Sequence, residues 1–217
     1  MSSDSQLKQA VLDELAWEPS VNAAHIGVTA HAGVITLSGH VTNHAHKQAA
    51  EKAAGRVKGV TAVAEEVEVI LPYETHRSDE DIAAAAADRL FWDSAVPKDR
   101  VKVTVEKGWV TLSGDVDWHF QREAADQDVQ RLMGVRGVSN EIVIKPTVNA
   151  SNVRDDIEQA LHRSWYYDPN TIKVSADGGR IKLTGVVTTW NARELAGSTA
   201  WSAPGVSSVT NDISVRS

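Results

Sequence analysis

Apolar residues recur along this chain in a fixed succession of spacings. In residues 7–15 they stand three and four positions apart, which predicts an amphipathic helix. Residues 26–37 alternate apolar and polar positions in two short runs around Gly33, the pattern of a β-hairpin. A second helical stretch over residues 49–57 precedes a final alternation over residues 67–69. The pattern predicts an α-β-β-α-β unit, an α+β fold with a small three-stranded mixed sheet and two helices on one of its faces.

The whole succession occurs three times, without a gap. Each copy contains a glycine-flanked strand with a Val/Ile-x-Leu centre, at residues 33–39, 108–114 and 179–185. The second copy follows the first by 75 residues and the third follows the second by 71, and such internal repetition marks a tandem module. We therefore predict three modules, residues 1–72, 73–146 and 147–217, divided near Pro72 and Pro146. Linkers this short are expected to hold the modules in a compact or curved array.

Repeated glycines and polar residues are expected to shape the ends of these elements. The glycines that close the second strand fit a bulge or a close backbone approach: Gly39, Gly114 and Gly185. Those that follow the second helix are expected to have positive φ: Gly59, Gly134 and Gly205. The expected N-caps of the second helices are Thr42, Asp117 and Thr188.

These motifs together resemble the BON domain family, which is named for bacterial osmotically inducible and nodulation proteins. The resemblance rests on the glycine-flanked strand, a basic residue in the following helix, Gly-Val, and then Asn-x-Ile. In copy two the basic residue and the Asn-x-Ile pair are Arg122, Asn140 and Ile142. In copy three they are Arg193, Asn211 and Ile213. The first copy has Lys47 and Glu65 in place of the arginine and asparagine, so it is the divergent one.

The resemblance implies a particular class of protein. Members are mostly bacterial envelope or stress proteins, often periplasmic, which are thought to contact phospholipids, and none is known as an enzyme. One cytoplasmic relative pairs the domain with another module and binds potassium.

Composition excludes several classes. The chain has no cysteine, so it has no disulfide framework, no thiolate metal site and no cysteine nucleophile. The longest apolar runs are shorter than the roughly 20 residues that span a bilayer. The N-terminal residues lack the basic and apolar regions of a secretory signal. The expected location is cytoplasmic for the sequence as it stands, with the periplasm as the alternative if a signal peptide was removed.

Charge argues against nucleic acid as a partner. The net charge is −7, and the three copies have 5, 10 and 7 Lys/Arg against 8, 14 and 7 Asp/Glu. The first two copies are acidic and the third is neutral. A binder of the phosphate backbone needs a clustered basic face, and no basic run occurs here.

Histidines are the first candidates for chemistry. His40, His44 and His46 lie close together at a predicted strand-to-helix junction, and imidazoles at such spacing can bind a transition metal. The alternative is a merely polar helix start, because His44 aligns with His119 and Trp190 and no cysteine or carboxylate completes the set. We expect no metal and no other cofactor.

Serine nucleophiles have no support either. Ser38 and Ser113 lie in Leu-Ser-Gly segments on the expected solvent face of a strand, and no Gly-x-Ser-x-Gly elbow surrounds them. Neither a general base nor an orienting group accompanies them. The sequence therefore predicts a protein that is not an enzyme.

The basic residues of the second helices allow two interpretations. Lys47, Arg122 and Arg193 stand at equivalent positions. Such a side chain can pack its stem over the sheet and pair with a carboxylate. It can also receive a lipid phosphate or another acidic group.

Tryptophan is enriched, with seven residues. Trp17 and Trp92 are equivalent, and we interpret them as packing anchors because two copies share them. The tryptophans found in one copy alone more often serve contact: Trp109, Trp118, Trp165 and Trp201.

The strongest contact candidate is the aromatic cluster of the third copy. Trp165, Tyr166 and Tyr167 follow the predicted first helix, and their rings suit the interface of a membrane. The alternative is that these rings fill the gap between modules two and three.

The sequence thus predicts a non-enzymatic binding or adaptor protein of stress or envelope type. Its expected partners are a membrane phospholipid surface or another protein. The alternative is a sensor of potassium or another small ligand, held by backbone carbonyls between modules.

Overall fold

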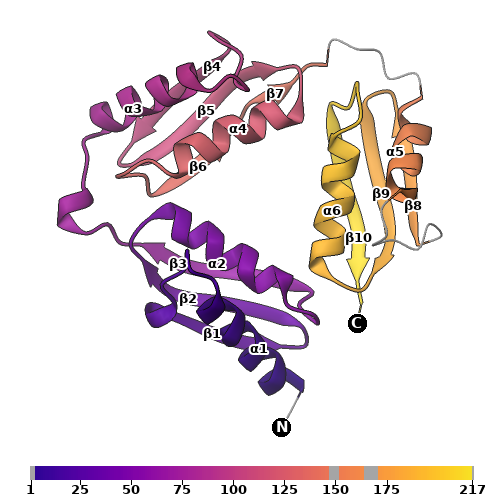
Figure 1. The fold of residues 1–217 in the computed structure, drawn as a ribbon, viewed down its shortest axis with the longest axis horizontal. Helices are drawn as coiled ribbons and strands as arrows, with labels where there is room; N and C mark the ends of the chain where they lie inside the picture. Colours follow the sequence, from indigo (N-terminus) through magenta and orange to yellow (C-terminus); the bar gives the residue numbers. More distant parts are fainter. Residues whose placement is uncertain (1–2, 147–151, 164–170, 217) are drawn as a thin grey trace.

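The computed structural model describes residues 3–146, 152–163 and 171–216 and shows three modules of one topology (Figure 1). Module 1 comprises α1 (Ser3–Trp17), η1 (Ala23–His25), β1 (Ile26–His31), β2 (Val34–Val41), α2 (His44–Arg56) and β3 (Ala62–Val69). After the short helix η2 (Tyr73–Thr75), module 2 comprises α3 (Asp79–Trp92), β4 (Val101–Glu106), β5 (Trp109–Val116), α4 (His119–Gln130), β6 (Gly137–Asn140) and β7 (Val143–Ile144). Module 3 comprises α5 (Val153–His162), β8 (Ile172–Asp177), β9 (Arg180–Val187), α6 (Trp190–Trp201) and β10 (Ser208–Val215).

Each module has a small mixed sheet. In module 1 the strand order is β1-β2-β3, with β2 antiparallel to β1 and parallel to β3. Module 3 repeats this arrangement as β8-β9-β10. In module 2 the third strand is divided into β6 and β7, and both pieces run parallel to β5. The predicted α+β fold with three tandem modules is confirmed.

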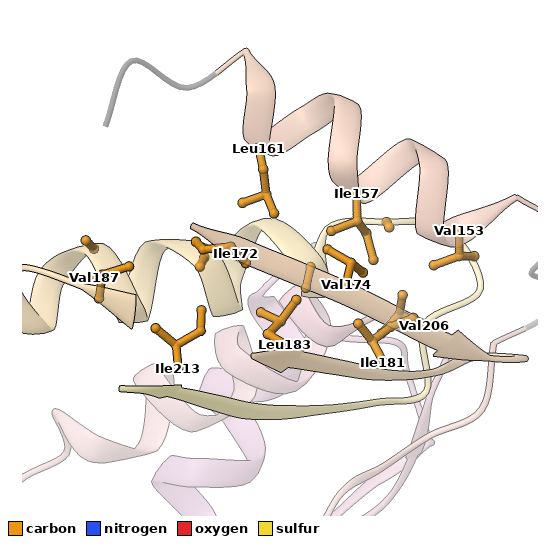
Figure 2. Packing of buried hydrophobic residues seen from close by; sticks show 14 residues of the cluster. Val153, Ile157, Leu161, Ile172, Val174, Ile181, Leu183, Val187, Val206 and Ile213 are labelled. Carbon is orange, nitrogen blue, oxygen red and sulfur yellow. The ribbon is translucent and has the colours of Figure 1, made fainter. Parts of the chain in front are cut away.

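Each module also has its own core, between the sheet and its two helices. In module 3, Ile157 and Leu161 of α5 point toward Val174 and Leu183 on the sheet (Figure 2). Period-two alternation places every second strand residue on the covered face, and helical spacing aligns one stripe of α5 with it. These apolar residues lose most of their exposure to water on folding, which stabilises each module separately.

A close backbone approach occurs at the end of each second strand, as predicted. A Cβ atom built on the closing glycine would lie 2.0 Å from the carbonyl oxygen of a residue just before the first strand. The pairs are Gly39 with His25, Gly114 with Arg100, and Gly185 with Thr171. No side chain fits at that distance, so the hairpin can form only with glycine there.

The glycines after the second helices have the predicted positive φ, 96° at Gly59, 90° at Gly134 and 85° at Gly205. The predicted N-caps are wrong by one residue. Asn43 caps α2 by accepting from the amide of His46 at 2.8 Å, and Thr189 caps α6. The cap falls one residue later because its side chain must reach the amide of the third helical residue.

The modules form a triangle (Figure 1). The second helices α2, α4 and α6 lie on its inner side, while α3 and α5 lie toward its outer edges. Within the described residues, no helix combines the length and the apolar character needed to cross a membrane.

Candidate functional site

The basic residue of the second helix holds the third strand of its own module. Nη2 of Arg122 donates to the carbonyl oxygen of Asn140 at 2.9 Å, and Nη2 of Arg193 donates to that of Asn211 at 2.8 Å. The asparagine side chains return the contact, because Nδ2 donates to the carbonyl of the same arginine at 3.1 and 2.8 Å. This Arg–Asn clasp ties helix to strand and engages the guanidinium inside the module. It supports the structural interpretation of these arginines.

Module 1 has a weaker version of the clasp. Nζ of Lys47 donates to the carbonyl of Val67 at 2.8 Å and lies 3.7 Å from the Glu65 carboxylate. Burial raises the pKa of Glu65, although the charge of Lys47 opposes this. Oε1 of Glu65 is buried and has no hydrogen-bond partner among the described residues. A carboxylate cannot donate as an asparagine amide does, so the reciprocal bond is missing.

The three candidate histidines do not converge. His40 stacks on His25 with ring centroids 4.7 Å apart, and Nδ1 of His46 lies 3.3 Å from Oγ1 of Thr42. His44 is instead buried, with 6% of its surface exposed. No group of three or more His, Cys, Asp or Glu side chains that could hold a metal occurs in the described part of the chain.

His44 belongs to a junction between modules. It begins α2, and the backbone of Arg136 in module 2 lies near its imidazole. Nδ1 of His44 is buried and has no hydrogen-bond partner among the described residues. Burial lowers the pKa of His44, the nearby charge of Lys47 acts in the same direction, and the backbone of Arg136 opposes both by raising the pKa. A neutral imidazole therefore fills this junction near pH 7.

The equivalent residues make the other two junctions. His119 begins α4 and stacks on Trp201, the last residue of α6 in module 3. Trp190 begins α6, and its Cδ1 atom would lie 2.9 Å from a Cβ built on Gly55 in α2 of module 1. Contacts from module 1 to 2, 2 to 3 and 3 to 1 close the triangle, the geometry of head-to-tail units that form a ring.

The two shared tryptophans are not packing anchors. Trp17 is 84% exposed and Trp92 is 82% exposed. In α1 the buried face contains Val11 and Leu15, four residues apart, and Trp17 follows Leu15 by two positions. Residues two positions apart on a helix lie on different faces, so Trp17 is turned away from the core. The anchor interpretation is therefore wrong, and both rings face solvent.

Aromatic residues from two helices lie together at a place that the sequence pattern does not predict. Trp118 and Phe120 at the start of α4 line the same hollow as Trp201 at the end of α6. The only signal for this pairing is that both ends belong to second helices of neighbouring copies. The predicted contact cluster Trp165–Tyr167 lies outside the described residues, and its hypothesis stays a prediction.

A family model described as the BON domain matches the chain three times, over residues 3–70, 78–146 and 149–217. This chain belongs to the BON domain family. Osmotically-inducible protein Y of Escherichia coli (strain K12) is 31% identical to it over 146 residues, which is 65% of this chain and 73% of that protein. The family motif read from the sequence, including the Arg122–Asn140 and Arg193–Asn211 pairs, thus corresponds in the BON modules to the helix-to-strand clasp.

Two solved structures of a Chlamydia trachomatis protein are also similar. CdsD, a structural protein of the type III secretion system, matches with 18% identity over 97% of this chain and 92% of its own. The C-terminal domain of CdsD matches with 18% identity over 100% of both chains. The TM-score is 0.27 in each case, so neither structure bears on how these three modules are arranged.

Proposed function

We propose that this chain is a non-catalytic BON protein of stress or envelope type that binds phospholipid surfaces peripherally. Family membership supports the general class. So does the similarity to a protein whose name describes induction by osmotic conditions. The observation that carries the lipid proposal is the exposure of Trp17 and Trp92 at equivalent helix ends.

The ends of the first helices have the chemistry of an interfacial anchor. Phe91, next to Trp92, is 55% exposed, and Nζ of Lys98 lies 4.7 Å from the centre of the Phe91 ring. Indole rings favour the boundary between water and lipid because their body is apolar and their N–H is polar. In module 3 the sequence Trp165–Tyr167 follows the same helix, so each module supplies aromatic residues at this point of its sequence.

Charge sets the kind of surface that fits. With a net charge of −7 the protein is repelled by anionic lipid, and salt screens that repulsion. Insertion of aromatic rings does not depend on opposite charge. We therefore expect zwitterionic vesicles to be bound at low salt, and anionic vesicles to be bound better as salt increases.

Vesicle flotation tests the proposal. The unmodified protein and a Trp17→Ser/Trp92→Ser variant are mixed with zwitterionic vesicles whose headgroups are ethanolamine and contain no trimethylammonium, and the bound fraction is measured. The variant should lose most of its binding while its melting temperature stays nearly unchanged, because both rings are exposed in the protein. Potassium and sodium titrations by calorimetry, run in parallel, test the alternative of an ion sensor.

Tyr73→Ser is the matched control. Tyr73 is 91% exposed but lies in η2 and not at the end of a first helix, so this variant should bind as well as the parent. Binding that survives loss of both tryptophans would show that this proposal is wrong. Equal loss in the Tyr73 variant would mean that exposed aromatic rings contribute wherever they stand, and that the ends of the first helices are not the specific contact.

A further inference from the structure

A hollow of about 360 Å³ lies at the junction of modules 2 and 3. Three aromatic side chains line it: Trp118 and Phe120 from the start of α4, and Trp201 from the end of α6. Because the rings come from two modules, the hollow exists only while the junction is closed. Its volume is in the range of small-ligand pockets.

The lining also carries a negative charge. The carboxylate of Glu123 belongs to it, and the Glu123 side chain is 57% exposed. Nδ1 of His119 lies 3.7 Å from that carboxylate. Burial, and then the charge of Arg122, lower the pKa of His119 to about 4, so the imidazole is neutral near pH 7. Within the described ranges, no lysine or arginine forms an ion pair with Glu123, and its charge is free to attract a cation.

The aromatic rings of this hollow are likewise not occupied by a cation of the chain. Among the described residues, cations lie over rings at two places, Lys98 over Phe91 and Arg193 over Trp190. Neither ring lines the hollow. Aromatic faces next to an uncompensated carboxylate attract cations through the ring quadrupole and through direct charge.

The junction of modules 3 and 1 offers a natural comparison. Its hollow, of about 440 Å³, is lined by Trp190 and by Glu194, which is equivalent to Glu123. However, Lys52 and Arg56 also line it, and Arg193 covers the Trp190 ring at 4.9 Å. Glu51 lines this hollow too, but the Arg193 guanidinium already lies over the ring, and its Nη1 is 3.4 Å from the Glu194 carboxylate, where a ligand cation would bind.

We propose that the hollow between α4 and α6 binds a quaternary ammonium group of the choline kind. Such a group spreads its charge over methyl groups that pack on aromatic faces, which makes it the cation best suited to an aromatic lining. Glu123 adds attraction for the charge, and it also disfavours a ligand whose own carboxylate lies close to the ammonium. Choline and tetramethylammonium should therefore bind better than betaine.

Two titrations followed by tryptophan fluorescence and calorimetry test the cation. The first uses choline, and the second uses its neutral isostere, in which a tert-butyl group replaces the trimethylammonium. Choline should bind about threefold or more tightly than the isostere, because only choline gains the cation–π and carboxylate terms. Equal affinities would mean that the hollow binds choline only as an apolar groove does. If choline shows no saturable binding, the proposal is wrong.

Variants locate the site. Phe120→Ala removes an exposed ring, and Glu123→Gln removes the charge of an exposed carboxylate. Each should weaken choline binding by about threefold or more without unfolding the protein. Glu194→Gln is the matched control, since it makes the same change at the equivalent position, and it should leave the affinity unchanged. An equal loss in the Glu194 variant would place the cation on the general negative surface and refute the assignment.

Vesicles with choline headgroups distinguish the two sources of the ligand. If the site takes the lipid headgroup, free choline should compete with these vesicles in the Trp17→Ser/Trp92→Ser variant, and Glu123→Gln should weaken their binding. If it takes a free solute, choline should bind the protein without displacing it from vesicles. This test does not depend on Trp17 or Trp92, so failure of the peripheral lipid contact and failure of the choline site are separate results.

Discussion

The imidazole of His119 lies against the indole of Trp201, with ring centroids 4.2 Å apart and planes 14° from parallel. His119 begins α4 in module 2, and Trp201 ends α6 in module 3. The Trp201 side chain packs on the apolar cores of both modules. One stacked pair therefore connects two cores that the chain builds separately.

Acidification is expected to weaken this junction. The pKa of His119 is about 4 in the folded protein against an ordinary value of 6.5, because burial and then Arg122 disfavour the imidazolium, and these outweigh the nearby Glu123 carboxylate. The unfolded chain binds more protons between these values, so the contribution of His119 is present above pH 6.5 and is lost as pH falls toward 4. The loss should be on the order of 3 kcal/mol. Buried His44 adds a loss of the same sign.

Thermal unfolding over a series of pH values measures the effect. His119→Phe keeps an aromatic ring at the junction without a titrating group, so its stability should change less between these pH values than that of the parent. Parallel profiles for the two proteins would contradict a role of His119 in acid sensitivity.

A larger residue at Gly55 is expected to open the triangle between modules 3 and 1. Its Cβ would lie 2.9 Å from Cδ1 of Trp190, so the branched side chain in Gly55→Leu forces the two helices apart. Small-angle scattering should show a larger radius of gyration, while each module keeps its own core. Adding Trp190→Ala should restore the compact form, and an unchanged radius in the single variant would count against closure.

Module 1 should become more stable if it is given the Arg–Asn clasp that modules 2 and 3 have. In the Lys47→Arg/Glu65→Asn variant, an amide that donates to the helix takes the place of a partly buried carboxylate, one oxygen of which has no hydrogen-bond partner among the described residues. We expect a gain of about 1 kcal/mol in the free energy of unfolding, measured by denaturant titration. The reverse change in module 2, Asn140→Glu, should cost about 1–3 kcal/mol. The same sign in both experiments would contradict this account.

Gly134 should resist substitution more than Gly178 does. Both have positive φ, but a Cβ on Gly134 would lie 2.9 Å from Cβ of Arg77 and 3.0 Å from Cδ1 of Ile82, whereas none of the described atoms lies within 4 Å of one on Gly178. Gly134→Val should cost clearly more than the roughly 1 kcal/mol of left-handed strain, and Gly178→Val should cost about that strain alone. Equal melting temperatures would exclude the packing contribution.

Limited proteolysis tests the predicted module boundaries. Cleavage should begin between Pro72 and Ser78 or between Pro146 and Ser151, where the predicted modules meet, because cuts inside a hairpin would require breaking a sheet. Mass spectrometry of the early fragments identifies the sites. Early cuts within β1–β2 or its counterparts would refute the division.

Local patterns were enough to predict the fold of a module. Apolar spacing identifies the covered face of each helix and strand. The repeated glycines Gly39, Gly114 and Gly185 indicate a close backbone contact that only glycine permits. The sequence identifies the asparagine of the Asn-x-Ile motif as part of the family signature, but it does not predict that this side chain donates to the Arg122 carbonyl. That bond joins residues from a helix and a strand, and periodicity within either element contains no information about it.

The sequence by itself determined the number of modules, their topology and their cores, because these depend on short-range periodicity and on repetition. Helical spacing turns Trp17 away from the core of its own module, but only the tertiary structure decided that nothing else covers Trp17 and Trp92. The tertiary structure also decided that Phe120 and Trp201 line one hollow. Those two residues belong to different modules, and only the closure of the triangle brings their surfaces together.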